Sequence, residues 1–141
     1  MVTRSIHAAF AVLLASAALP AVAHHSFRAQ YDPEQPIALT GVVTKVDWMN
    51  PHVYFYIDVE NPATGAIENW GFEMGPPHML QQRGWKRNSM EIGDEVAVEG
   101  TRARDGSRTA NARRVQLTAT GEVLGAASSE SQTITSGQPR Q

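Results

Sequence analysis

The 141-residue sequence contains no cysteine. This absence excludes disulfide bonds, a lipid-modified cysteine and thiolate metal ligands. The chain also lacks a G-x-S-x-G elbow, a phosphate-binding glycine loop and an H-E-x-x-H motif, which are common signatures of enzymes. Neither sign of charge dominates, since 12 basic residues stand against 14 acidic residues. We therefore expect a protein that is not an enzyme, does not attract nucleic acid, and folds around its own core or a bound ion.

Residues 1–23 have the features of a secretory signal peptide. Arg4 precedes an apolar run over residues 8–19, and Ala21 and Ala23 form a small-residue cleavage site. The run is shorter than the roughly 20 residues that a transmembrane helix needs. A retained hydrophobic helix is the alternative. We expect cleavage near Ala23 and a periplasmic or secreted product without stable membrane insertion.

The rest of the chain is rich in β-forming residues and turn signals. Residues 24–36 contain two prolines, which disfavour a regular helix, and are predicted to be an extended N-terminal arm. Residues 53–59 alternate apolar and polar side chains, which is typical of a strand with one buried face. Residues 119–141 are dominated by small and polar residues and are predicted to be a disordered tail. The domain itself is expected over residues 37–118, with strands near 37–48, 52–59, 67–74, 95–100 and 110–117.

A short helix is expected over residues 78–83, because prolines precede it and Gly84 follows it. Gly41 interrupts the first strand and favours a bend there. Five strands, a bent first strand and a helix between the third and fourth strands are typical of the oligonucleotide/oligosaccharide-binding (OB) barrel. We therefore predict an all-β fold with a small α component, as a five-stranded OB-like antiparallel barrel. Another small antiparallel barrel or sandwich is the alternative.

The first functional hypothesis is a metal site at the mature N-terminus. Cleavage after Ala23 would leave His24 with a free α-amino group and a ring nitrogen, which together form a chelate suited to Cu(II). His25 or His52 would supply a third nitrogen, and His52 is preferred because neighbouring residues of an extended chain point to opposite sides. The alternative is that these histidines are ordinary solvated or turn residues. Zinc is the alternative ion, with an oxygen ligand from one of three aspartates: Asp32, Asp47 or Asp58.

The second hypothesis is a binding face made by aromatic residues of the second and third strands. Tyr54 and Tyr56 lie next to His52 on the face opposite to the expected core. OB-type barrels bind bases or sugar rings on this part of the sheet. Trp70 belongs either to this face or to the core, because a shift of one residue in register exchanges the faces. The face would bind a small ligand, a glycan or a partner protein, and ordinary cross-strand packing is the alternative.

The sequence contains the motifs H-H-S-F (24–27), W-x-N-P-H (48–52), N-W-G-F-E-M-G (69–75), R-G-W (83–85) and R-A-R-D-G-S (102–107). Together these motifs resemble an uncharacterised family of small secreted bacterial proteins, the domain-of-unknown-function family 6152. The resemblance covers nearly all of residues 24–118. It implies secretion and a compact β domain, and it implies no mechanism because the family has no assigned activity.

Overall fold

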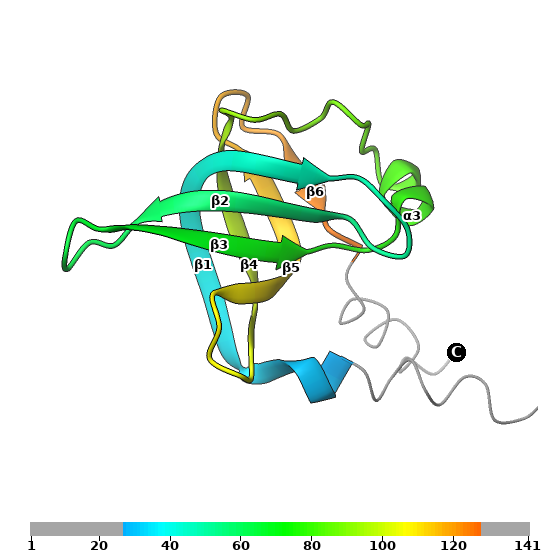
Figure 1. Cartoon of the computed structure of the whole chain (residues 1–141). Helices are drawn as coiled ribbons and strands as arrows, with labels where there is room; N and C mark the ends of the chain where they lie inside the picture. The colour runs from blue at the N-terminus through cyan, green and yellow to red at the C-terminus, as the bar shows by residue number, and fades with distance from the viewer. Residues whose placement is uncertain (1–26, 128–141) are drawn as a thin grey trace, which may run out of the picture.

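The computed structural model describes residues 27–127, which form a mostly β fold around one six-stranded sheet (Figure 1). The short helix α3 (Pro77–Gln82) lies between the third and fourth strands, and residues 27–30 form a helical turn before the first strand. Within the described part of the chain, no helix is long and apolar enough to cross a membrane. The strands are β1 (Tyr31–Asp47), β2 (Tyr54–Glu60), β3 (Ile67–Glu73), β4 (Glu95–Ala103), β5 (Thr109–Leu117) and β6 (Val123–Gly125).

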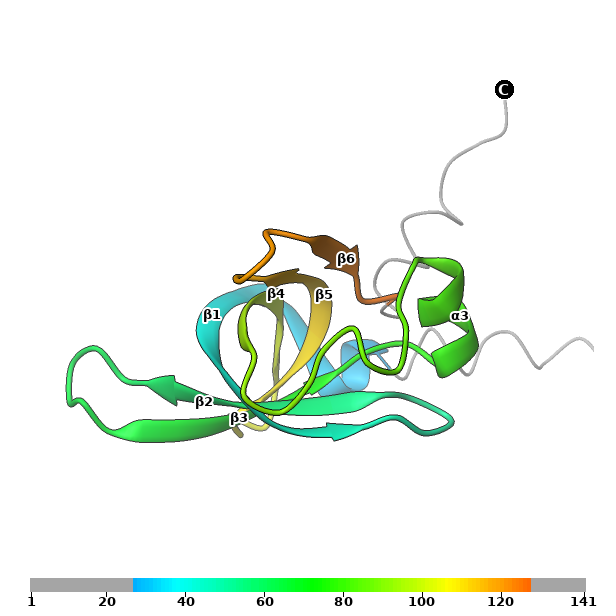
Figure 2. The same cartoon turned by 90° about the horizontal axis from the view of Figure 1, so that it is seen from above.

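The hydrogen bonds of the sheet run in a ring through five of these strands. The strand order is β3-β2-β1-β4-β5-β6, and β3 also pairs with β5. The β3–β5 pairing is parallel, and the other pairings are antiparallel. Figure 2 shows β1, β4 and β5 curving over the flatter β2–β3 hairpin. The predicted mostly β class with a small helical component is confirmed.

Strand β1 serves both sides of the ring. Its first part pairs with β4 and its last part, residues 42–47, pairs with β2. Gly41 lies where β1 changes partner, and a Cβ added there would be 2.4 Å from the carbonyl oxygen of Asp58. Glycine therefore permits the close approach of β1 and β2 at this point, because it has no side chain to displace.

The hydrophobic core fills the interior of the ring. Phe55 on β2 and Phe72 on β3 are fully buried, and their rings stack with centroids 5.3 Å apart. Along β2, Phe55, Ile57 and Val59 are buried and the residues between them are partly exposed, as the alternation predicts. Helix α3 adds the fully buried Leu80. Each large apolar side chain buried in this way contributes about 1.5–3 kcal/mol to folding.

The N-terminal boundary differs from the predicted extended arm of residues 24–36. Residues 27–30 are helical, and β1 already begins at Tyr31, which pairs with Ala103. The register between β1 and β4 is irregular between Tyr31 and Pro36. A proline lacks the N–H that a regular ladder requires, so an irregular stretch accommodates it. The two prolines therefore mark an irregularity inside a long strand rather than its beginning.

The predicted disordered tail of residues 119–141 includes residues that are part of the fold. Residues 123–125 form β6 on the edge of β5, and Ala126 and Ala127 are fully buried. The Trp85 indole Nε1 donates a hydrogen bond to the Gly125 carbonyl oxygen at 3.0 Å. A Cβ on Gly75 would be 2.3 Å from the Ala127 carbonyl oxygen. The small residues of this segment therefore allow close packing. Composition alone does not distinguish such a segment from a disordered one. Residues 128–141 lie outside the described residues.

Candidate functional site

All three tyrosines of the chain gather around Glu73 on the outer face of the β2–β3 hairpin. Tyr54 and Tyr56 lie directly opposite Glu73 and Gly71 in the β2–β3 register, so these four residues share one face. The third tyrosine, Tyr31, comes from the first residue of β1. The pairing of this residue with the end of β4 positions it next to Glu73.

The Glu73 carboxylate is buried and held by three side chains. Its Oε2 accepts hydrogen bonds from the Tyr31 hydroxyl at 2.9 Å and the Tyr54 hydroxyl at 2.8 Å. Its Oε1 lies 3.1 Å from His52 Nδ1. The residue is 8% exposed, and no lysine or arginine between residues 27 and 127 approaches its carboxylate within 4.0 Å. Two neutral hydroxyls and one imidazole thus surround a buried acid.

This environment raises the pKa values of the two tyrosines that donate hydrogen bonds to Glu73. Burial, followed by the negative charge of Glu73, raises the pKa of Tyr31 well above its usual range. Burial and the hydrogen bond to Glu73 raise the pKa of Tyr54 in the same direction. Both phenols therefore remain protonated hydrogen-bond donors throughout the physiological range.

A cavity of about 210 Å³ adjoins the carboxylate, and we call it the tyrosine cavity. It opens beside a larger surface hollow of about 470 Å³ at the end of β4, and the two share Gln30, Tyr31 and Thr109. The helical turn of residues 27–30 lies at this end of the sheet (Figure 1). The tyrosine cavity is lined mainly by six residues: Tyr31, Tyr54, Tyr56, Gly71, Glu73 and Thr109.

Asn111 adds an unusual polar group to this region. It lies opposite Glu73 in the parallel β3–β5 register and is 1% exposed. Its amide opposes the rise in the pKa of Tyr31, which places it near that hydroxyl. Neither its Nδ2 nor its Oδ1 has a hydrogen-bond partner within the described residues. A buried amide without partners is costly, typically by about 1–3 kcal/mol, and such groups often mark a site for water or a ligand.

The structure brings together three of the residues singled out from the sequence. Tyr54 and Tyr56 line the cavity, and His52 contacts its carboxylate with a side chain that is 38% exposed. Trp70 is instead 7% exposed and lies opposite Ile57, so it belongs to the core. The guanidinium of Arg102 lies over its ring at 5.5 Å.

The predicted metal ligands His24 and His25 lie outside the described residues. Between residues 27 and 127, no group of three or more histidine, aspartate or glutamate side chains is arranged to hold a metal ion. The three aspartates considered as oxygen ligands have other partners nearby. Asp32 pairs with Arg104, Asp47 pairs with Lys45, and Asp58 accepts a hydrogen bond from Asn69.

Sequence reasoning missed Tyr31, Glu73 and Asn111 as parts of one site. The sequence offers one signal for Glu73, which follows the apolar Phe72 at the end of a predicted strand. Side chains alternate between the two faces of a strand, so Glu73 is expected on the outer face, where a charged residue is ordinarily solvated. In the structure Glu73 is 8% exposed, and one of its contacts is the hydroxyl of Tyr31, 42 residues away in the sequence.

The chain belongs to a family of unknown function, DUF6152, whose family model matches residues 11–112. The match includes every residue that lines the tyrosine cavity. No curated protein matches the chain.

Proposed function

We propose that this family member is a small periplasmic or secreted binding protein, without catalytic activity, that holds a small ligand in the tyrosine cavity. The observation that carries the proposal is the convergence of all three tyrosines and a buried carboxylate on one cavity. Binding sites for small molecules are typically concave, rich in aromatic side chains and equipped with a few fixed polar groups. The volume of about 210 Å³ lies below the usual range of about 300–1,000 Å³, so it suits a small ligand or one part of a larger ligand.

We also propose that the five-stranded ring is an OB-like barrel. Closure of the five-stranded ring through a parallel β3–β5 pair, with α3 between β3 and β4, supports this description. Proteins of that architecture bind their ligands on the face of the second and third strands. The tyrosine cavity lies on this face, which supports the same location for the ligand.

The experiment is an NMR screen of the isotopically labelled mature protein against small cationic, neutral and anionic compounds. Binding in the cavity predicts shifts of the Gly71 and Thr109 amide signals. The double variant Tyr54→Ala/Tyr56→Ala should lose these shifts. Ile67→Ala is the matched control, because Ile67 is exposed at the other end of β3. Failure of every compound to bind, or equal binding by the double variant, would contradict the proposal.

A second candidate function is the binding of Cu(II), with zinc as the alternative ion, by His24, His25 and His52. The observation that favours it is the 3.1 Å contact between His52 Nδ1 and Glu73 Oε1. A histidine that binds a metal commonly directs its other ring nitrogen at a carboxylate, which orients the ring. Glu73 would hold His52 in this way and leave Nε2 for the ion.

Copper binding is tested on protein secreted so that its natural N-terminus forms, with the terminus verified by intact mass. Titration with Cu(II) should give nitrogen-rich coordination at one equivalent in the paramagnetic resonance spectrum. His24→Ala, or one additional residue before His24, should abolish the tight site. His78→Ala is the matched control, since His78 lies on α3. Unchanged affinity in His24→Ala would rule out this function.

A further inference from the structure

Within the described residues, no lysine or arginine pairs with the carboxylate of the tyrosine cavity. Glu73 is buried and receives hydrogen bonds from two phenols, whose hydroxyls carry no charge. His52 balances the charge only when it is protonated. A buried carboxylate is costly unless a positive charge or several donors compensate it. The cavity beside it is therefore a favourable position for a cation.

The walls of the cavity also favour a cation. Aromatic rings attract positive groups to their faces, because the π electrons make these faces negative. Tyr56 already displays this property, since the Lys45 ammonium lies 5.2 Å from its ring centroid. Lys45 pairs with Asp47 at 2.6 Å, so its charge is balanced outside the cavity. Lys45 is therefore not the basic partner of Glu73.

The hydrogen-bonding groups next to the cavity include Asn111, which lies opposite Glu73 in the β3–β5 register. Neither atom of its side-chain amide has a hydrogen-bond partner within the described residues, and the residue is 1% exposed. A carboxylate has about four acceptor positions, and three groups contact Glu73 in the structure. The Glu73 carboxylate in the cavity wall thus retains capacity to accept a hydrogen bond, whereas the hydroxyls of Tyr31 and Tyr54 already donate to it. An anion would meet the negative charge of the carboxylate without a basic residue to hold it.

We propose that the tyrosine cavity binds an organic ammonium group, with Glu73 as its counter-charge and the rings of Tyr54 and Tyr56 as its walls. The inference rests on the proposed function and specifies the ligand class. The group comes either from a soluble amine or from the headgroup of a lipid. Both sources present the same ammonium chemistry to the same residues.

The test compares choline with its neutral isostere 3,3-dimethyl-1-butanol, in which carbon replaces the charged nitrogen. Calorimetric or NMR titration of the mature protein should give binding of choline at least about tenfold tighter than that of the alcohol, because only choline carries a charge for Glu73 to compensate. Ethanolamine tests whether a primary ammonium is also accepted. Equal or tighter binding of the alcohol would overturn the inference but would retain the small-ligand site. Absence of binding by all three compounds would overturn the inference, and the proposed function fails only if the full NMR screen is also negative.

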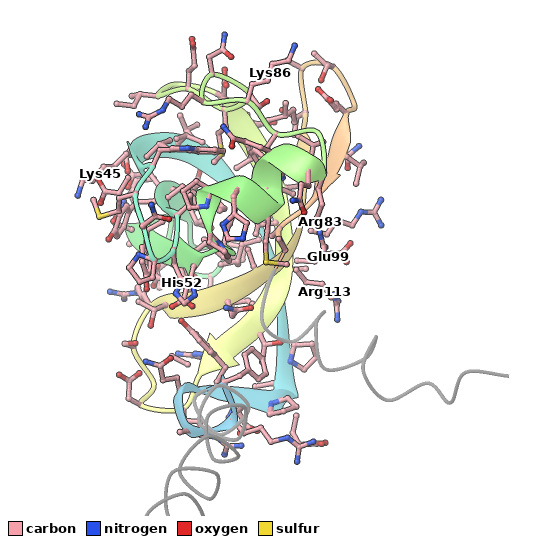
Figure 3. The ribbon with its side chains drawn as sticks, turned by 90° about the vertical axis from the view of Figure 1, so that its right-hand side faces the viewer. Lys45, His52, Arg83, Lys86, Glu99 and Arg113 are labelled. Carbon is pink, nitrogen blue, oxygen red and sulfur yellow. The ribbon has the colours of Figure 1, made fainter. Side chains whose placement is uncertain are left out.

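The variants separate charge from shape. Glu73→Gln keeps the size of the side chain and should weaken choline binding about tenfold or more, with little change for the alcohol. Tyr56→Leu should weaken choline binding by removing a ring face, and it supplies an independent test if Glu73→Gln does not fold. Glu99→Gln is the matched control, because Glu99 pairs with Arg113 and Arg114 elsewhere on the surface, apart from His52 (Figure 3). Unchanged choline affinity in both cavity variants would overturn the inference.

The source of the ammonium is distinguished with vesicles. Co-sedimentation with phosphatidylcholine vesicles, reduced by free choline, would support a lipid headgroup as the ligand. Binding of choline without co-sedimentation would support a soluble amine. Co-sedimentation that persists in Glu73→Gln and resists competition by choline would count against recognition through the cavity.

Discussion

The hydroxyl of Tyr31 donates a hydrogen bond of 2.9 Å to Glu73 Oε2, joining the first residue of β1 to the last residue of β3. Tyr54 reaches the same oxygen from β2. Three strands therefore meet at one buried carboxylate on the outside of the ring. Phe27 packs against Tyr31 with ring centroids 5.4 Å apart, so the helical turn before β1 covers this junction.

Replacing Tyr31 with Phe should destabilise the protein measurably. The change keeps the ring and removes one hydroxyl donor from a buried carboxylate, and hydrogen bonds to charged groups contribute about 1.5–3 kcal/mol. Chemical denaturation of the two proteins measures the difference in free energy of unfolding. Tyr56→Phe is the control, because the Glu73 contacts come from Tyr31, Tyr54 and His52. It should change stability by less than about 0.5 kcal/mol. Equal effects of the two substitutions would refute the assigned role of Tyr31.

Alkaline titration should reveal two protected tyrosines. The raised pKa values of Tyr31 and Tyr54 mean that their tyrosinate absorbance appears well above pH 10 in the folded protein. In the unfolded chain all tyrosines should titrate near pH 10. The folded protein then binds more protons than the unfolded protein, so its stability should fall as the pH rises above about 10.

The negative charge of Glu73 contributes to the raised pKa values of both Tyr31 and Tyr54. A variant without this charge therefore tests the assignment. In Glu73→Gln, both pKa values should decrease toward the ordinary value, and burial should still hold them above it. Ultraviolet difference spectra of the two proteins measure the change. A profile identical to that of the natural protein would show that Glu73 does not face these phenols.

Replacing Gly75 with Ala should detach the segment that contains β6. The added Cβ would be 2.3 Å from the Ala127 carbonyl oxygen, and both partners are held by backbone. Steric overlap in a packed core typically costs about 1–3 kcal/mol. Because Trp85 is 2% exposed and bonds to Gly125, its fluorescence should shift to the red.

Gly125→Ala is the matched control for that experiment. A Cβ there would lie 3.5 Å from the Arg83 guanidinium, which is an ordinary contact with a flexible side chain. This variant should retain the stability and fluorescence of the natural protein. If Gly75→Ala behaved in the same way, the close packing of residues 75 and 127 would be wrong.

The elements that sequence reasoning predicts best have strong local patterns. The alternation of β2 identifies its buried face, and the prolines before residue 78 and Gly84 after residue 83 delimit α3. The strand β6 has three residues in a composition typical of linkers, so periodicity gives no signal for it. Its position depends on packing against Gly75 and Trp85, which are distant in the sequence.

The candidate site depends more on long-range contacts than the fold does. Tyr54 and Tyr56 are predictable as neighbours because they alternate along one strand. The face of Trp70 depends on its pairing with Ile57, a register that local sequence leaves open. Glu73 accepts a hydrogen bond from Tyr31, and the prolines that follow Tyr31 in the same strand make this residue difficult to assign to β1.

The most direct test of the central claim is an NMR measurement on protein in which only tyrosine is labelled. Because the chain has three tyrosines and all of them line the cavity, the ring signals should report on the site alone. With choline present, we expect nuclear Overhauser contacts from the ligand methyl groups to the rings of Tyr54 and Tyr56. Bound choline that contacts none of the tyrosine rings would contradict it.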